Sequence, residues 1–136
     1  MTQDDHVREE VLTVLPKLKV IPSADLMKKI SNLMKNDWSL SVQTKAIIAL
    51  TKLGDVDESM SNLTPRLSSN DSHLRISALE TVPEISQYLN HSFDIKPILD
   101  SLEDPSATIR RAAVSALGSL KNESITKTPG RIFDRC

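Results

Sequence analysis

The segment TIRRAAVSALGSL, residues 108–120, decides the fold of this chain of 136 residues. Its apolar side chains stand at Ile109, Ala113, Leu117 and Leu120, the spacing that puts side chains on one face of an amphipathic α-helix. Three other stretches align with it without gaps and carry apolar residues at the same relative positions, 0, 4, 8 and 11. Their position-0 residues are Val7, Val42 and Leu74.

The four position-0 residues are separated by 35, 32 and 35 residues, the length of one helix–turn–helix repeat. A second kind of apolar helix fits between each neighbouring pair, at residues 24–34, 56–67 and 93–102. Proline, glycine and cap residues separate these segments, and no segment alternates with the period of two that indicates a strand. The sequence therefore predicts an all-α fold of about seven helices without strands.

The predicted repeat domain covers residues 1–121. Its inner helices, those that carry the four aligned stretches, are expected near residues 5–19, 39–53, 71–88 and 105–121. Residues 122–136 lose the apolar periodicity, so we expect them to form a flexible C-terminal tail. Thr128 in this tail is followed by proline and then by Arg131 at the third position. This pattern makes Thr128 a candidate phosphorylation site.

The stretch from Asp104 to Gly118, DPSATIRRAAVSALG, resembles the second helix of a HEAT repeat. In that family aspartate and proline precede a β-branched residue, arginine, alanine and then Leu-Gly. Residues 37–53 and 71–85 resemble the pattern less fully, with Gln43 in place of the arginine in the former and a shorter loop in the latter. The resemblance covers roughly residues 4–121. It implies a short right-handed superhelix, a HEAT-like or armadillo-like solenoid, with the second helices lining its concave side.

The resemblance also implies a structural ladder, in which the arginine after each position-0 residue bonds an aspartate in a neighbouring turn. Gln43 leaves one rung uncharged, so we expect the ladder to be weakest between the first and second repeats. The residues assigned to the ladder are Arg8, Arg75 and Arg110 as donors and Asp37, Asp71 and Asp104 as acceptors.

Little in the sequence indicates catalysis or a bound cofactor. The three histidines stand apart, and neither an HExxH motif nor a Cys-x-x-Cys pair occurs. The His-Glu dipeptides of the HEAT-like di-iron hydroxylases are absent, and three glycines provide no phosphate-binding loop. We therefore predict a protein that is not an enzyme and that has no metal site and no cofactor.

Composition restricts the partners and the compartment. A net charge of −1 and an aromatic content of 3% disfavour nucleic acid, which is bound through basic surfaces and stacked rings. The N-terminus is polar and acidic, and no apolar run approaches the ~20 residues that span a bilayer. Cys136 is the only cysteine, so an intrachain disulfide cannot form. We expect an intracellular protein, cytoplasmic or nuclear, without a membrane anchor.

The predicted function is that of a scaffold or adaptor that binds another protein along the concave face. Positions 2, 3, 6 and 10 of the inner helices project there if positions 0, 4, 8 and 11 face the core. Ile48 and Ile76 then lie inside a frame of both charge signs, as an interface core lies within its rim. Alternatively, these isoleucines complete a wide core stripe. The candidate partner-binding residues on this face are Thr44, Lys45, Ile48, Lys52, Ile76, Glu80, Glu84, Arg111 and Ser115.

Trp38 is a further candidate for partner binding. It lies four residues before Val42, and tubulin-binding TOG domains, which are HEAT arrays, also place a tryptophan four residues before an inner-helix apolar residue. TOG-like tubulin binding is therefore one alternative function, and a nucleic-acid-binding HEAT-like array is another. The competing structural interpretation is that Trp38 packs over the end of the first repeat.

The first inner helix has no outer helix before it, so the repeat pattern begins in mid-repeat. Either the chain is part of a longer array, or its first segment acts as a cap with a polar outer face that contains Glu9 and Glu10. Self-association or extension of the array through this unpaired helix is the corresponding prediction.

Overall fold

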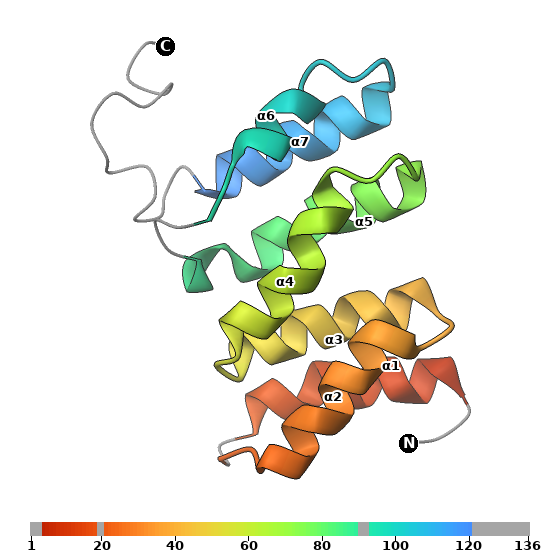
Figure 1. Ribbon diagram of the computed structural model, residues 1–136, viewed down its shortest axis with the longest axis vertical. Helices are drawn as coiled ribbons and strands as arrows, with labels where there is room; N and C mark the ends of the chain where they lie inside the picture. Colours follow the sequence, from red (N-terminus) through yellow and green to blue (C-terminus); the bar gives the residue numbers. More distant parts are fainter. Residues whose placement is uncertain (1–3, 19–20, 90–92, 121–136) are drawn as a thin grey trace. The chain divides into compact units, whose positions relative to one another are not determined.

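The computed structural model describes residues 4–18, 21–89 and 93–120, and Figure 1 shows the course of the chain. These residues form seven α-helices and two short 3-10 helices, and they contain no strand. The prediction of an all-α fold is thus confirmed for the described residues, whereas the right-handed superhelix stays a prediction. The α-helices are α1 (Asp5–Val14), α2 (Ala24–Asn36), α3 (Leu40–Lys52), α4 (Val56–Leu67), α5 (Ser72–Ile85), α6 (Lys96–Ser101) and α7 (Ala107–Leu120).

Two predictions fall outside the described residues: the flexible tail at 122–136 and the phosphorylation of Thr128. The predicted helix at 56–67 coincides with α4, and the one at 24–34 begins where α2 begins. The predicted helix at 93–102 is shortened to α6, which starts at Lys96 next to Pro97. Proline is favoured at this place because the N–H groups in the first turn of a helix have no partner within the helix. The absence of an N–H in proline therefore breaks no helical hydrogen bond.

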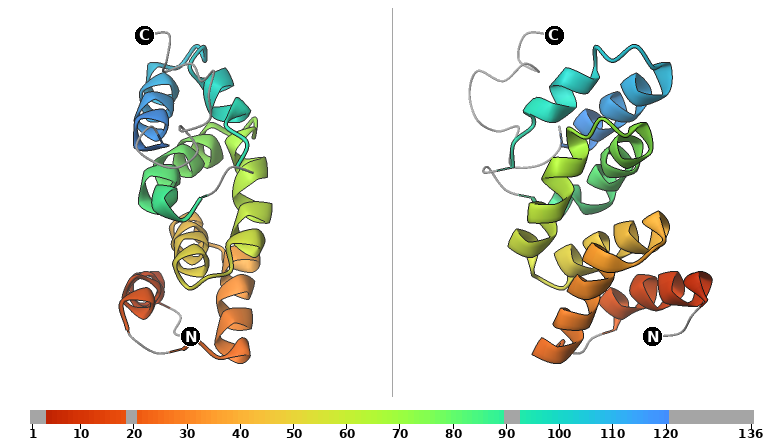
Figure 2. Two further views of the ribbon diagram at one scale, coloured as in Figure 1. Left: turned by 90° about the vertical axis from the view of Figure 1, so that its left-hand side faces the viewer. Right: turned by 45° about the vertical axis from the view of Figure 1, so that its right-hand side comes forward.

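The chain forms two compact units, an N-terminal unit of residues 1–63 and a C-terminal unit of residues 64–136, with the boundary inside α4. In the N-terminal unit, α3 packs against both α1 and α2. The left-hand view of Figure 2 shows α1 and α3 nearly end-on in one layer, with α2 running beside them in a second layer. The core of this unit contains Leu12, Ile30, Met34, Val42, Ala46, Ile47, Leu50 and Leu63.

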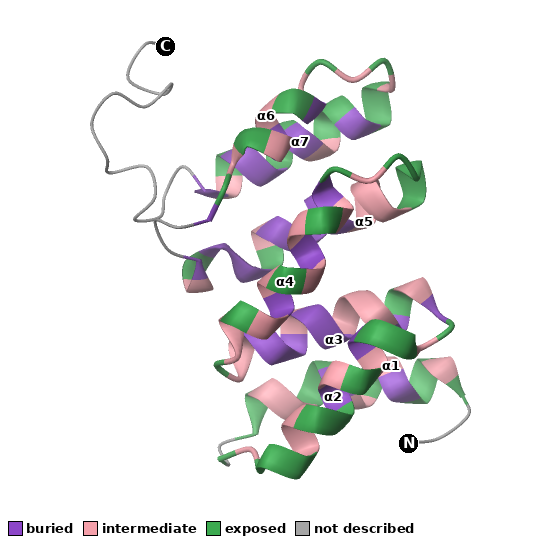
Figure 3. Cartoon of the chain, viewed as in Figure 1, coloured by how far each residue is buried: buried purple, intermediate pink, exposed green. Residues whose placement is uncertain are grey.

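In the C-terminal unit, α7 packs against α5 and α6. Ile109, Ala113, Leu117 and Leu120, the four positions picked out by the sequence pattern, are all buried in α7. Figure 3 shows that buried and exposed residues alternate along α7. The remaining core side chains of this unit are Leu67, Ala78, Leu79, Val82, Ile85, Leu89, Phe93, Ile98 and Ala116.

The first inner helix departs from the predicted pattern. Val7 and Leu18 were expected to face the core, but their side chains are 41% and 48% exposed. The other two expected core residues, Val11 and Leu15, are half-buried. The buried residues of α1 are Arg8 and Leu12, each one position after an expected core residue, Val7 or Val11. The helix also shortens, because α1 gives way to a 3-10 helix, η1 (Leu15–Lys17), at Pro16, which cannot donate the next α-helical hydrogen bond. The expected helix over residues 5–19 is therefore wrong at its C-terminal end.

The turn after α3 shows why a glycine follows that helix. Gly54 adopts a φ of 107°, a conformation open to glycine but strained for other residues. The Gly54 N–H donates to the carbonyl of Thr51, and the Asp55 N–H donates to that of Leu50. These two bonds are those of a Schellman motif, which ends α3 and directs the chain into α4.

Candidate functional site

An aspartate precedes each of the four inner helices and takes the same local role. Its Oδ1 accepts a hydrogen bond from the backbone N–H two residues later, at 2.8–2.9 Å. Such a bond satisfies an N–H near the start of a helix that would otherwise lack a partner. The four aspartates are Asp4, Asp37, Asp71 and Asp104.

Two of these carboxylates also bind the arginine of the preceding inner helix. Arg8 holds Asp37 with two bonds, Nε to Oδ2 at 2.8 Å and Nη2 to Oδ1 at 3.1 Å. Both side chains are only 5% exposed. Arg75 Nη2 lies 2.6 Å from Asp104 Oδ2, and this pair is more exposed. Each pair joins residues 29 positions apart, so it holds one repeat against the next.

The other residues assigned to the ladder take different roles. Asp71 is exposed and caps α5 through the His73 N–H. Arg110 donates to the carbonyl oxygens of Asp104 and Pro105, at 2.8 and 2.9 Å. Gln43 donates from Nε2 to the carbonyl oxygen of Asp37, in the turn just before its own helix. A continuous ladder along the array therefore stays a prediction.

The hydrogen bond from the Ser106 N–H lowers the pKa of Asp104, and Arg75 lowers it further. Because the folded-state pKa is depressed, the ionised carboxylate stabilises the folded chain above the pKa of the unfolded form, about 3.9. This stabilisation is lost as the pH falls through the folded-state pKa. We expect Asp104→Asn to lower the melting temperature at pH 7, and the difference from wild type to shrink below about pH 4.

The control for this pH series is Glu103→Gln, which removes an exposed carboxylate from the neighbouring position. Thermal unfolding followed by far-UV circular dichroism between pH 3 and pH 7, values set by the ~3.9 reference, measures both variants. A constant difference between Asp104→Asn and wild type over this range would contradict the assignment.

The candidate partner-binding residues fall into two sets, one in each unit. Thr44, Lys45, Ile48 and Lys52 lie on α3 and are half-buried. In the C-terminal unit Ile76 is half-buried, whereas the other candidates on α5 and α7 are exposed. Since α5 packs against α7, the structure brings this second set together on adjacent helices. The exposed members are Glu80, Glu84, Arg111 and Ser115.

The charged groups of the chain differ in whether they form ion pairs between elements. Some take part in ion pairs between elements, such as the Arg–Asp pairs and Lys35 Nζ to Glu58 Oε1 at 2.9 Å. The candidate charges of the inner helices form no ion pair with any residue in the described part of the chain. These are Lys45, Lys52, Glu80, Glu84 and Arg111.

Trp38, in the turn between α2 and α3, is 76% exposed. The guanidinium carbon of Arg8 lies 5.6 Å from the ring centroid, within the range of a cation–π interaction. The ring therefore contacts the first inner helix through Arg8 and leaves most of its surface to solvent.

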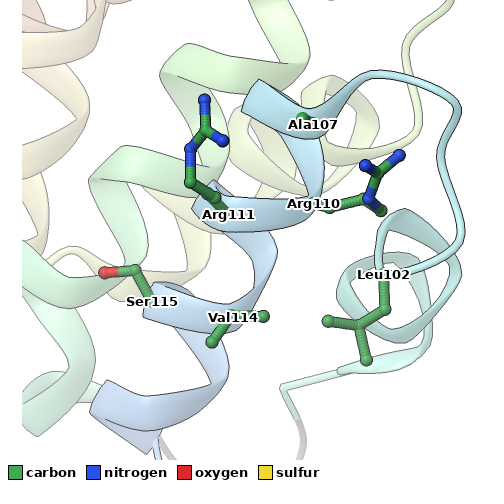
Figure 4. A pocket seen from close by; sticks show the side chains of 6 residues that line it. All are labelled: Leu102, Ala107, Arg110, Arg111, Val114 and Ser115. Carbon is green, nitrogen blue, oxygen red and sulfur yellow. The ribbon is translucent and has the colours of Figure 1, made fainter.

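Sequence reasoning missed an open groove of about 590 Å³ along α7. Figure 4 shows Arg110 and Leu102 on one side of this helix, Arg111 and Ser115 on the other, and Val114 between them. Val114 occupies relative position 5, which carries buried Leu12, Ile47 and Leu79 in the other inner helices. An apolar residue at this position in all four repeats was the signal that a second packing face exists.

The described part of the chain contains neither a cluster of metal-ligating side chains nor a helix that could span a membrane. Within residues 4–18, 21–89 and 93–120, no three metal-ligating side chains gather in one place. Each helix in those ranges is too short or too polar to cross a lipid bilayer.

Comparison with known proteins agrees with the geometry of the C-terminal unit. A family model described as HEAT repeat matches residues 95–122, a range that includes α6 and α7. A comparison with curated proteins finds no match to the chain. The family match covers the helix that carries the resemblance noted in the sequence and the outer helix packed against it. The match at residues 95–122 supports a HEAT-repeat helical family for this part of the chain.

Proposed function

We propose that the chain is a non-catalytic scaffold or adaptor that binds a segment of another protein along its inner helices. HEAT repeats often mediate protein interaction, which supports this class of function by analogy of fold. The observation that carries the proposal is the set of inner-helix charges without ion-pair partners in the described structure. The lone Cys136 and the proposed role fit action in the cytoplasm or nucleus.

The charges differ in what they can contribute to a partner. Arg8 and Asp37 bind each other in a buried pair, so a partner could use either only by breaking that pair. Other charges of the inner helices form no ion pair with any of the described residues. These are Lys45 and Lys52 on α3 and Glu80 and Glu84 on α5. Charges of this kind steer association and select a partner with complementary charges.

Ile48 in the N-terminal unit and Ile76 in the C-terminal unit are the apolar residues proposed for partner binding. Both are half-buried, so each contributes to packing and still presents part of its side chain to solvent. A partner segment with an apolar anchor and charges of both signs fits this combination, since an apolar core within a polar rim is typical of protein interfaces.

The test is partner capture from native cell extract, followed by affinity measurement on the purified partner. We expect Lys45→Glu combined with Lys52→Glu to weaken binding at least about tenfold, because like charges then face the partner. Ile48→Asp combined with Lys52→Glu should act more strongly through loss of the apolar anchor. The matched control reverses two exposed charges of the outer helix α2, Lys28→Glu with Lys29→Glu.

Circular dichroism must first show that each variant keeps its fold. If folded inner-helix variants bind the partner with wild-type affinity, the proposal is wrong. Binding to DNA with a steep salt dependence would instead favour the nucleic-acid alternative.

Tubulin is a second candidate partner because Trp38 lies four residues before Val42, as in TOG domains. Its exposure leaves it accessible to a partner, and tryptophan is common among the residues that dominate binding energies. The same assay includes purified tubulin and the variant Trp38→Ala. One outcome is that Trp38→Ala abolishes tubulin binding while the Lys45 and Lys52 double variant keeps it. This result would contradict the inner-helix proposal and support tubulin binding through Trp38.

A further inference from the structure

Exposed apolar side chains gather on one face of the first inner helix and on the last one. Val7 and Val14 lie on α1, and Leu18 follows its 3-10 continuation, whereas Val114 lies in the α7 groove and is 60% exposed. We propose that these two surfaces bind each other between molecules, so that α1 of one copy enters the α7 groove of a second copy. This self-association goes beyond the proposed binding of another protein, and the two surfaces share Arg111 and Ser115.

Residues of the α7 groove occupy the same repeat positions as the face of α1 that packs against α3. α1 packs against α3 through the face that carries buried Arg8 and Leu12, and Glu9 on this face accepts a 2.6 Å hydrogen bond from Ser41 of α3. Arg110 and Val114 occupy the same two repeat positions in α7 as Arg8 and Leu12 in α1. The groove therefore presents the kind of face that an inner helix covers in the N-terminal unit.

The exposed face of α1 is the surface that we propose to enter the α7 groove of a second copy. Val7 and Val14 occupy the repeat positions of Val42 and Ala49, which are fully buried in α3. In α3, which packs against α1 and α2, small and medium apolar side chains at these positions are thus covered by neighbouring helices of the same chain. The same positions on α1 are available to a second molecule.

Charge complementarity identifies a second copy as the occupant. α1 carries three carboxylates, of Asp5, Glu9 and Glu10, and one guanidinium, of Arg8, for a formal charge of −2. α7 carries Arg110 and Arg111 and no acidic residue, for a formal charge of +2. Opposite charges at the rim favour α1 against α7 and disfavour α1 against α1 or α7 against α7.

The proposed contact joins two different surfaces, so it is heterologous. Such contacts generate rings or open chains, because every copy keeps one free face of each kind. A single ten-residue helix in a shallow groove buries little area, which is typical of weak and transient association. We therefore expect reversible association that grows with protein concentration and weakens at high salt.

The experiment is sedimentation velocity of the full chain over a range of concentrations, with wild type and three single variants. Val7→Asp alters the α1 face, Val114→Asp alters the groove, and Ile21→Asp is the control, since Ile21 is exposed but lies on neither face. We expect the wild type and the control to associate and each face variant to stay monomeric. A mixture of Val7→Asp and Val114→Asp should form a dimer and nothing larger, because one intact face of each kind remains.

Other outcomes would overturn the proposal. Association of Val114→Asp by itself would show that α1 pairs with α1, and a wild type that stays monomeric at every concentration would show that no such contact forms. If only a chain shortened to residues 1–121 associates, residues 122–136 occupy the groove in place of a second copy. Restored association in Glu10→Arg combined with Arg111→Glu, each of which alone weakens it, would support the charge complementarity of α1 and α7.

Discussion

Replacing Arg8 with alanine is expected to destabilise the N-terminal unit by about 3–5 kcal/mol, the usual cost of removing one member of a buried ion pair. The carboxylate of Asp37, which is 5% exposed, would lose both bonds from the guanidinium and remain in a site with little access to water. The cation–π contact with Trp38 would be lost as well, which adds a smaller term.

Urea unfolding followed by tryptophan fluorescence suits this test, because Trp38 is the only tryptophan in the chain and lies against Arg8. Arg75→Ala is the matched control, followed by circular dichroism, since its pair with Asp104 occupies the same register but is more exposed. We expect a smaller loss there, because solvent screens an exposed pair. A loss below about 1 kcal/mol in Arg8→Ala, the range of a surface pair, would contradict a structural role for the buried pair.

Replacing Ala113 with phenylalanine is expected to destabilise the C-terminal unit by about 1–3 kcal/mol, through overpacking of a filled core. Ala113 is fully buried in α7, which packs against both α5 and α6. The larger ring therefore requires displacement of a helix or strained side-chain rotamers.

Thermal unfolding by circular dichroism measures this effect, with Ala107→Phe as the control at an exposed position of the same helix. Fluorescence of Trp38 separates the two units, since Trp38 belongs to the N-terminal one. An unchanged melting temperature in Ala113→Phe would contradict the helical register assigned to α7.

The sequence predicted the helices and most of the core because apolar periodicity reports which side chains share a face. It could not show whether another element covers that face. Ile109 and Leu120 are buried as expected, whereas Val7 and Leu18 occupy the same repeat positions and are exposed. The apolar residue at relative position 5 of all four repeats indicates a second packing face, but the pattern of positions 0, 4, 8 and 11 leaves it out and so did not predict the groove around Val114.

The candidate site was predicted in part. The arginine and aspartate positions followed from the resemblance to HEAT repeats, but the partners depend on three-dimensional geometry. Arg8 and Arg75 reach aspartates 29 residues away, whereas Arg110 binds carbonyl oxygens of the turn before its own helix. The sequence alone does not distinguish these two arrangements.

Asp37 both caps the start of α3 and binds α1, so it links fraying of α3 to detachment of α1. Its carboxylate accepts the Ser39 N–H at the start of α3 and binds Arg8 on α1, while its carbonyl oxygen accepts from Gln43. Detachment of α1 would therefore leave this carboxylate without its cation and free to turn toward water, away from the Ser39 N–H. Fraying at the start of α3 is thus coupled to the departure of a helix some 29 residues earlier in the chain. Such coupling makes the N-terminal unit open cooperatively, as one element, rather than one helix at a time.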